Sequence, residues 1–466
     1  MSIKIIILAA GKGSRMKSNL PKVLQPLAGK PLLHHVLTTS GQLKPEGITA
    51  VIGHGSELVK TYMANFKNIN YVEQTEQLGT GHAVMQAEKM YSDEDTVLIL
   101  YGDVPLITGE TLKCLMSKVD DKQPLALLTL KLDDPTGYGR IVRDSNNLIE
   151  AIVEEKDASV EQKEIGEVNT GIMAVKGKYL RVWLDKLSCF NASKEYYLTD
   201  IIAMCVSDGY MVASTQPLSE QEVLGVNNKK QLQDLERAYQ KMLARNLMLD
   251  GVTIADASRI DIRGVLVVGE DVSIDVNVVF EGKVRLGRDV TIGANCVLKN
   301  CSVENGTTIH PFTYIDGSEI GEECEIGPYA RIRPGTEIAD SVKIGNFVET
   351  KKSKIGKGSK ISHLSYIGDS KIGHLCNIGA GTITCNYDGV NKYKTILGDN
   401  VFIGSSTQLV APVSIASNVT IGAGSTITKD VTDSGLTLSR AKQISLKNWK
   451  RPVKTYSKQN ENPLKH

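Results

Sequence analysis

Residues near the start of the chain have the types and spacing that could bind a nucleotide phosphate. Gly11 and Gly13 lie in the turn LAAGKGSRM, which contains Arg15 and is soon followed by Lys22. Glycines let backbone N–H groups approach a phosphate closely, and the arginine and lysine add positive charge. The turn is neither the dinucleotide pattern G-x-G-x-x-G nor a P-loop, because no G-K-[ST] follows. We therefore expect a phosphate site of another kind.

Asp103 is a candidate metal ligand. It follows Thr96 to Leu100, TVLIL, an apolar run typical of a buried parallel strand. In open α/β sheets ligands collect outside the carboxyl ends of the strands, so a carboxylate there is well placed to hold Mg²⁺. Asp103 could instead merely cap the next turn. The phosphate-type turn in the same region favours the metal.

A second group of residues with side chains suited to binding or catalysis lies in the other half of the chain. Arg333 and Lys351 are eighteen residues apart, and each directly follows a position that we expect to point inward. If eighteen residues make one coil, the two cations lie side by side and could hold an anion. An exposed charge ladder is the alternative. His363 has a side chain that titrates near neutral pH, although a lone histidine is more often structural.

A six-residue repeat must position these side chains. Ile320, Ile326, Ile332, Ile338 and Ile344 recur at strict six-residue intervals, and the period extends from residue 286 to residue 427. An amphipathic helix would repeat near 3.6 residues and a half-buried strand every two, so neither explains the pattern. Short steps with an inward aliphatic residue and small or polar residues between them predict a parallel β-helix, three steps to a coil.

One segment departs from the repeat. Between Ile378 and Leu397 the residues Asn386, Tyr387, Asp388 and Gly389 interrupt the aliphatic period. We expect an extruded loop, and loops that leave a rigid solenoid usually bind something.

The chain divides into four predicted parts. Ile3 to Leu8 is a continuous aliphatic run, as expected of a central parallel strand. Apolar residues at threes and fours predict an amphipathic helix that ends at Asp250-Gly251. We predict an α/β domain at residues 1–228, a linker helix at 229–250, the β-helix at 251–440 and a basic tail at 441–466.

Composition excludes several classes of protein. The chain has 466 residues, 23% of them charged, and its net charge of +1 gives no basic field of the kind that binds nucleic acid. Eight cysteines without a C-x-x-C pair fit free thiols in a reducing cytoplasm. The apolar opening is short, and nothing later approaches the roughly 20 apolar residues of a membrane span. We expect a cytoplasmic protein without membrane insertion.

The first half resembles the sugar-nucleotide pyrophosphorylases, which join a nucleoside triphosphate to a sugar 1-phosphate. The matching segments are, in order, LAAGKGSRM, LPKVLQPLAGKPLL, EQTEQLGTGHAVMQA, YGDVPL, GYGRIV, IVEEKDA, EVNTGI and GVNN. The resemblance implies a Rossmann-like, mostly parallel α/β domain of the uridyltransferase branch, which uses UTP and Mg²⁺. Its implied catalytic residues are Arg15 and Lys22, and its metal ligands are Asp103 and Asn227. The implied substrate-binding residues are Leu8, Ala9, Ala10, Gly11, Lys22, Gln74, Gly79, Thr80, Tyr101, Gly102, Asp103, Gly139, Glu154, Asn169 and Asn227.

The second half resembles the acetyltransferase part of the bifunctional uridyltransferase–acetyltransferase family of bacterial cell-wall synthesis. The matching segments are RIRPG, GNFVETKKSKIGKGSKISHLSYIGD, NIGAGTITCNYDGVNKYKT and VFIGSSTQLVAPV. The resemblance implies a left-handed β-helix, a homotrimer, and acetyl transfer from acetyl-CoA to glucosamine 1-phosphate, with His363 as general base and Glu349 as its partner. The implied sugar-phosphate ligands are Arg333, Lys351, Tyr366 and Asn377, and the implied acetyl-CoA contacts are Ala380, Asn386, Tyr387, Ser405, Ala423 and Arg440.

Two other functions compete with this interpretation. A monofunctional sugar-1-phosphate nucleotidyltransferase could use the β-helix only to oligomerise, which would leave His363 and the Asn386 loop without a purpose. A non-catalytic exchange-factor subunit of similar two-part build is disfavoured by the intact G-x-G-x-R turn with Lys22 and Asp103.

Overall fold

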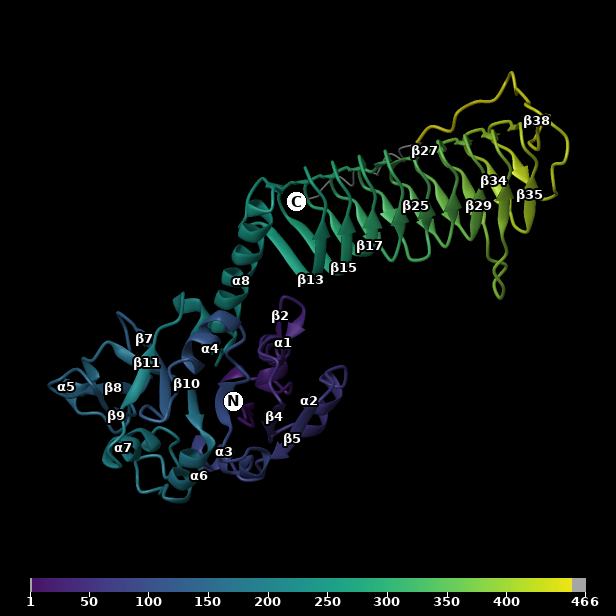
Figure 1. Ribbon diagram of the computed structural model, residues 1–466. Helices are drawn as coiled ribbons and strands as arrows, with labels where there is room; N and C mark the ends of the chain where they lie inside the picture. Colours follow the sequence, from purple (N-terminus) through teal and green to yellow (C-terminus); the bar gives the residue numbers. More distant parts are fainter. Residues whose placement is uncertain (1, 455–466) are drawn as a thin grey trace, which may run out of the picture. The chain divides into compact units, whose positions relative to one another are not determined.

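The computed structural model describes residues 2–454 and contains two compact units, residues 1–329 and 330–466 (Figure 1). Among the described residues, no helix combines the length and the apolar character that crossing a membrane requires. Residues 441–454 contain neither helix nor strand, and the rest of the predicted basic tail, 455–466, lies outside the described residues.

A twisted sheet forms the centre of the first part of the chain. Its order is β11-β7-β10-β6-β1-β4-β5, and β8 and β9 form a hairpin beside β10. The strands are β1 (Ile3–Ala9), β4 (Gly47–Ile52), β5 (Ile69–Glu73), β6 (Thr96–Tyr101), β7 (Leu125–Lys131), β8 (Arg140–Arg143), β9 (Ile149–Val153), β10 (Glu167–Lys176) and β11 (Val212–Thr215), with a small separate hairpin, β2 (Pro26–Leu27) and β3 (Lys30–Pro31). The predicted central strand is β1, which pairs in parallel with both β4 and β6. Strand β10 runs antiparallel to β6 and β7, so the sheet is mostly parallel.

Helices cover both faces of this sheet because successive residues of β1 point to opposite sides. Ile5 and Ile7 join one apolar core, whereas Ile6 and Leu8 join the other. The helices are α1 (Leu32–Gln42), α2 (Ser56–Tyr62), α3 (Thr80–Met85), α4 (Gly109–Met116), α5 (Val160–Lys163), α6 (Gly177–Asp185) and α7 (Asp200–Ser207). Residues of α1 and α4 pack in the first core, and residues of α3, α6 and α7 pack in the second.

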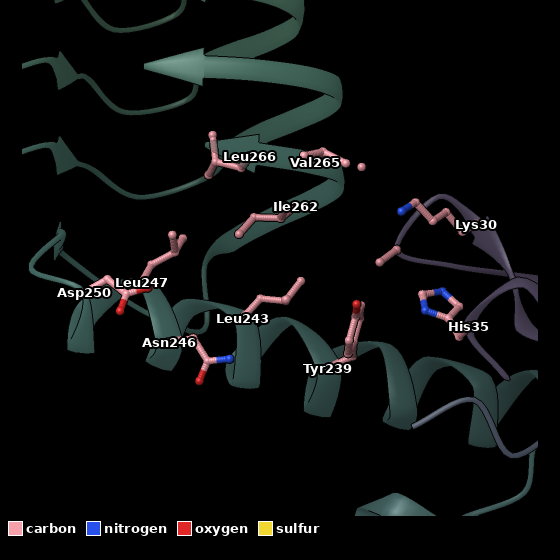
Figure 2. A pocket seen from close by; sticks show the side chains of 12 residues that line it. Lys30, His35, Tyr239, Leu243, Asn246, Leu247, Asp250, Ile262, Val265 and Leu266 are labelled. Carbon is pink, nitrogen blue, oxygen red and sulfur yellow. The ribbon is translucent and has the colours of Figure 1, made fainter. Parts of the chain in front are cut away.

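Helix α8 (Lys229–Leu249) begins where the Asn228 side chain accepts a hydrogen bond from the Gln231 N–H at 2.9 Å. A pocket of about 270 Å³ lies beside it, between the β2–β3 hairpin and strand β13 (Ile260–Val268) (Figure 2). There the rings of His35 and Tyr239 meet edge to face at 5.3 Å, and burial lowers the pKa of His35. No residue of a predicted site lines this pocket.

The repeat forms coils of a parallel β-helix, as predicted. In the first unit the coil strands are β12 (Thr253–Ile254), β13 (Ile260–Val268), β14 (Ser273–Ile274), β15 (Val278–Leu286), β16 (Thr291–Ile292), β17 (Val297–Val303), β18 (Thr308–Ile309), β19 (Tyr314–Asp316), β20 (Glu319–Ile320) and β21 (Glu325–Ile326). Ile274, Ile292, Ile309 and Ile326 are register partners on successive coils, and all are buried. The aliphatic position of the repeat therefore builds the core.

The second unit repeats this construction. Its strands are β22 (Arg331–Ile332), β23 (Glu337–Ile338), β24 (Lys343–Asn346), β25 (Glu349–Lys351), β26 (Lys354–Ile355), β27 (Lys360–His363), β28 (Tyr366–Gly368), β29 (Ser370–Ile372), β30 (Asn377–Ile378), β31 (Ile383–Cys385), β32 (Thr395–Leu397), β33 (Phe402–Ile403), β34 (Gln408–Val410), β35 (Val413–Ile415), β36 (Val419–Ile421), β37 (Thr426–Ile427) and β38 (Gly435–Thr437). Ile344, Ile361, Ile378, Ile403 and Ile421 stack in register. The long interval before Ile403 contains the predicted extruded loop.

Candidate active sites

A cavity of about 260 Å³ opens at the carboxyl ends of β1 and β6. It collects ten of the predicted nucleotide-site residues, namely Leu8, Ala9, Ala10, Gly11, Lys22, Gln74, Gly79, Thr80, Tyr101 and Asp103. Gly102 lies between two of these and donates its N–H to the Leu8 carbonyl at 2.9 Å, which joins the two strand ends. The position agrees with the rule that parallel sheets bind ligands beyond the carboxyl ends of their strands.

Two residues that line this cavity, Lys22 and Asp103, belong to a cluster of four polar side chains. Lys22 Nζ donates to Asp103 Oδ2 and, at 3.2 Å, to Asn227 Oδ1. Arg15 also donates to Asn227 Oδ1, at 3.0 Å. The two oxygens are hard ligands that suit Mg²⁺, which commonly binds one or two protein groups and takes its remaining ligands from phosphates and water. The donor set therefore fits the predicted ion.

The resemblance implies that Gln74, Gly79 and Thr80 bind the uracil ring, and the loop that contains them, here called the uracil loop, is held by its own side chains. Gln74 is buried, and its Nε2 lies 3.0 Å from the Gly79 carbonyl and 3.2 Å from His82 Nδ1. Gly79 has a φ of 110°, a conformation that L side chains rarely adopt. A glycine is thus required where the loop turns into α3.

Three further predicted residues form a separate group that does not line the cavity. Gly139 precedes β8, Glu154 follows β9, and Asn169 lies in β10. The Asn169 N–H donates to the Gly139 carbonyl at 2.8 Å. A Cβ built on Gly139 would lie 3.3 Å from Glu154 Oε2, so the carboxylate is adjacent to the glycine. The three residues come from distant segments but lie together.

The Glu154 carboxylate lies in an unfavourable environment for a charge. Burial raises its pKa, and the nearby carboxylates of Asp200, Asp157 and Glu195 raise it further. The Thr199 hydroxyl acts in the opposite direction by donating to Glu154 Oε1 at 3.0 Å.

Sequence reasoning missed two features of this site. One is the segment Tyr196–Thr199, which contacts both the uracil loop and Glu154. The other is Gly171, whose φ of 84° and position against the Tyr101 ring leave no room for a side chain. The glycine of the N-T-G segment was a signal for the second, but no local pattern identified the first.

In the second unit, His363 ends β27 and pairs in register with Asn346 at the end of β24. His363 Nδ1 lies 2.9 Å from Asn346 Oδ1. Since an amide oxygen only accepts, Nδ1 carries the proton and Nε2 is left with a lone pair. Nε2 is therefore the ring nitrogen that can accept a proton.

The expectation that Glu349 is the partner of His363 is wrong. Glu349 Oε1 accepts from Arg333 Nη1 at 2.7 Å, and Asn346 occupies the position beside the histidine. Asn346 and Glu349 both lie about one coil before His363, so spacing alone could not show which of them contacts the histidine. Their side chains belong to strands on different faces.

Arg333 and Lys351 lie on neighbouring coils, as their spacing predicted. The Arg333 N–H donates to the carbonyl of Thr350, directly before Lys351. A third cation, Lys392, lies beside Lys351 and lowers its pKa, and burial and the charge of Arg333 lower it further. Sequence reasoning overlooked Lys392, although it belongs to the segment that breaks the repeat.

Tyr366 and Asn377 lie on strands that pair with the strands of Glu349 and His363. Tyr366 is the register partner of Glu349, and Asn377 is the register partner of Lys360 on the strand that ends at His363. A Cβ on Gly368 would lie 2.5 Å from the Tyr366 hydroxyl, so the glycine makes room for the tyrosine.

The residues predicted to contact acetyl-CoA follow one corner of the β-helix. The Ser406 N–H donates to the Ala380 carbonyl at 2.7 Å, and the Gly424 N–H donates to the Ser405 carbonyl at 2.8 Å. Arg440 Nη1 continues the line by donating to the Ala423 carbonyl at 2.9 Å.

The predicted loop is a small hairpin that leaves the coils between β31 and β32 (Figure 1). The Tyr393 N–H donates to the Asn386 carbonyl at 2.9 Å and closes its base. Asn386 is buried and donates its side-chain N–H to Asp369 Oδ2 at 2.5 Å, whereas Tyr387 is exposed. Of the two predicted acetyl-CoA contacts here, only Tyr387 thus has an exposed side chain.

Three family models match parts of the chain. A MobA-like NTP transferase domain matches residues 5–156, a GMPPB C-terminal domain matches residues 262–336, and a model of six bacterial transferase hexapeptide repeats matches residues 394–429. Both predicted kinds of domain are therefore represented.

Three known proteins, each named bifunctional protein GlmU, are similar over almost the whole chain. The protein of Marinobacter nauticus is 55% identical over 452 residues, which cover 97% of this chain and 99% of the relative. That of Nitrosomonas eutropha is 56% identical over 455 residues, with 97% and 99% covered. That of Nitrosospira multiformis is 57% identical over 453 residues, with 97% and 98% covered.

Proposed function

The chain belongs to the family of the bifunctional protein GlmU, and we propose that it makes UDP-N-acetylglucosamine by two group transfers. The first moves an acetyl group from acetyl-CoA to the amine of glucosamine 1-phosphate. The second joins N-acetylglucosamine 1-phosphate to the uridylyl group of UTP and releases pyrophosphate. The observation that carries the proposal is the arrangement in the second unit, where Asn346 holds the His363 ring and the cations Arg333, Lys351 and Lys392 lie together.

In acetyl transfer the sugar amine attacks the thioester carbonyl carbon, and the C–S bond breaks as the thiolate leaves. His363 would accept the amine proton at Nε2 while Asn346 holds Nδ1–H. Arg333, Lys351 and Lys392 would bind the sugar phosphate, and Tyr366 and Asn377 would orient the ring. Acetyl-CoA would follow the corner from Ala380 to Arg440 and the hairpin at Tyr387.

In uridylyl transfer the sugar phosphate oxygen attacks the α-phosphorus of UTP in line with the departing pyrophosphate. Arg15 and Lys22 would bind the phosphates, Gln74, Gly79 and Thr80 would hold uracil, and Gly139, Glu154 and Asn169 would hold the sugar. Asp103 and Asn227 would hold Mg²⁺, which neutralises triphosphate charge when bound.

We also propose that the protein is a cytoplasmic homotrimer. All eight cysteines are free thiols, as expected in a reducing compartment. The hexapeptide repeats supply long lateral faces that a partner copy would cover. Multi-angle light scattering gives the mass in solution, and a monomer would contradict the trimer.

Free thiol release from acetyl-CoA tests the acetyl transfer. We expect release only with glucosamine 1-phosphate present, and a loss of at least about 100-fold in His363→Ala, as for a general base. His374→Ala is the matched control, because His374 is also exposed in the second unit. Pyrophosphate release from UTP and N-acetylglucosamine 1-phosphate should survive both substitutions. Pyrophosphate release without any thiol release would instead support the monofunctional alternative.

A further inference from the structure

We propose that Thr199 is a positioning residue for uridylyl transfer, which holds the Glu154 carboxylate in place to receive the sugar. The inference rests on the proposed function of Glu154 as a sugar ligand. It concerns a residue that acts through Glu154, not one that touches the reacting atoms.

Thr199 has the position of a helix cap but uses its side chain differently. It directly precedes α7 and is only 7% exposed. A threonine here usually accepts a hydrogen bond from the first turn of the helix. In the described chain its side chain makes no such bond; its hydroxyl donates to Glu154 Oε1 at 3.0 Å instead.

This hydrogen bond fixes the orientation of the Glu154 carboxylate relative to the predicted sugar contacts. Oε1 is bonded to Thr199, whereas Oε2 lies on the side of Gly139. Gly139 is in turn bonded to the Asn169 N–H. Oε2 is therefore the oxygen directed toward the other two predicted sugar contacts, and rotation of the carboxylate would break the Thr199 bond.

The backbone that carries Thr199 is attached to the nucleotide loop. The Leu198 N–H donates to Thr80 Oγ1 at 3.2 Å, and the Gly81 N–H donates to the Tyr196 carbonyl at 2.8 Å. Tyr196 returns a bond from its own N–H to the Leu78 carbonyl at 2.8 Å. Thr199 thus connects the predicted uracil loop with the predicted sugar carboxylate.

Electrostatics makes the Thr199 hydroxyl the main favourable partner of the Glu154 charge. Burial raises the pKa of Glu154, and the hydrogen bond from Thr199 opposes this rise. The titratable groups that face Glu154 come from the turn after β9, from the segment before α7, from α7 and from the end of β6; they are Asp157, Glu195, Tyr197, Asp200 and Tyr101. Without the hydroxyl the carboxylate would be harder to ionise and less able to accept from a sugar hydroxyl.

Steady-state kinetics of Thr199→Val and Thr199→Ser test the proposal. For Thr199→Val we expect a rise of about tenfold in the KM for N-acetylglucosamine 1-phosphate, as for a lost hydrogen bond to a charged group, with little change in the KM for UTP. The acid limb of kcat/KM should move up by about one pH unit, since the free enzyme must ionise Glu154. Thr199→Ser should restore both values.

Thr111→Val is the matched control. Thr111 is also a buried threonine, and its hydroxyl donates to the buried Glu222 carboxylate at 2.6 Å. We expect it to leave the KM for the sugar phosphate and the acid limb unchanged. An unchanged KM for UTP, whose predicted site lies in the same compact unit as Thr199 and Thr111, reports that this unit is folded in each variant.

A double-mutant cycle with Glu154→Gln separates positioning from a general structural role. If Thr199 acts through Glu154, adding Thr199→Val to Glu154→Gln raises the KM by less than twofold. An undiminished tenfold rise in that background, or an unchanged KM in Thr199→Val alone, overturns the proposal. A wild-type protein that makes no UDP-N-acetylglucosamine would instead refute the proposed function itself.

Discussion

At the scale of single residues, Lys351 lies among charges of its own sign. Its pKa is lowered by the neighbouring Lys392, by burial and by the charge of Arg333, and Asp369 only partly compensates. Such a cluster is unfavourable when empty, and an anion relieves the repulsion. The arrangement therefore favours a phosphate group over a neutral ligand.

Replacing Lys392 with glutamine tests this interpretation through pH. In the wild type Lys351 loses its proton at a lower pH than an ordinary lysine, so as the pH is raised the KM for glucosamine 1-phosphate should increase earlier than it would with an ordinary lysine. In Lys392→Gln the pKa of Lys351 rises, and this alkaline limb should move to higher pH although the KM near neutral pH increases by about tenfold.

Lys371→Gln is the control for that measurement, because Lys371 is an exposed lysine of the same unit. It should leave the KM and the alkaline limb unchanged. An alkaline limb that stays in place in Lys392→Gln would show that the two lysines are not coupled.

At the scale of elements, α8 is bound to its neighbours through one buried amide. Gln240 is 1% exposed; its Nε2 donates to the Ile262 carbonyl at 3.0 Å and to Glu236 Oε1 at 2.9 Å, and its Oε1 accepts the Ile262 N–H at 2.7 Å. Glu236 also accepts the Ala28 N–H at 2.7 Å. The helix thus pairs with the backbone of β13 and of the β2–β3 hairpin.

Gln240→Leu should loosen this attachment. It leaves the buried Ile262 N–H and C=O without partners, which costs about 1–3 kcal/mol for each group. We expect faster amide hydrogen exchange in peptides that contain Ile262 and a lower thermal midpoint. Gln233→Leu, an exposed position on the same helix, should change neither, and equal exchange in the two variants would contradict the role of the amide.

At the scale of the whole molecule, the two proposed chemistries lie in different compact units. Every residue assigned to uridylyl transfer falls within residues 1–329, and every residue assigned to acetyl transfer falls within residues 330–466. Only the first set includes metal ligands. Each activity should therefore persist when a residue or ion that only the other activity needs is removed.

Removal of divalent cations should separate the two activities. With EDTA in excess we expect pyrophosphate release from UTP to fall at least about 100-fold, because the triphosphate charge is no longer neutralised, while thiol release from acetyl-CoA stays within about twofold. Added Mg²⁺ should restore the first activity. A parallel loss of both activities would show that acetyl transfer also needs a metal.

The sequence by itself determined most of the architecture, because its strongest signals concern near neighbours. In a solenoid each coil contacts only the next, so a six-residue period specifies both the core and the register. This is why the positions of Ile344, Ile361 and Ile378, and the adjacency of Arg333 to Lys351, followed from spacing alone. The phosphate-type turn and Asp103 were likewise predictable, since parallel strands end at a common edge.

Only the tertiary structure decided which side chains meet when spacing leaves a choice or the segments are distant. Asn346 and Glu349 are both about one coil from His363. Only Asn346 lies on the same face of the β-helix as the histidine, and it therefore makes the contact. Lys392 reaches Lys351 because a hairpin returns toward the coils, and Thr199 reaches Glu154 across 45 residues because α7 packs beside β9. Such contacts depend on packing between elements, which no local period encodes.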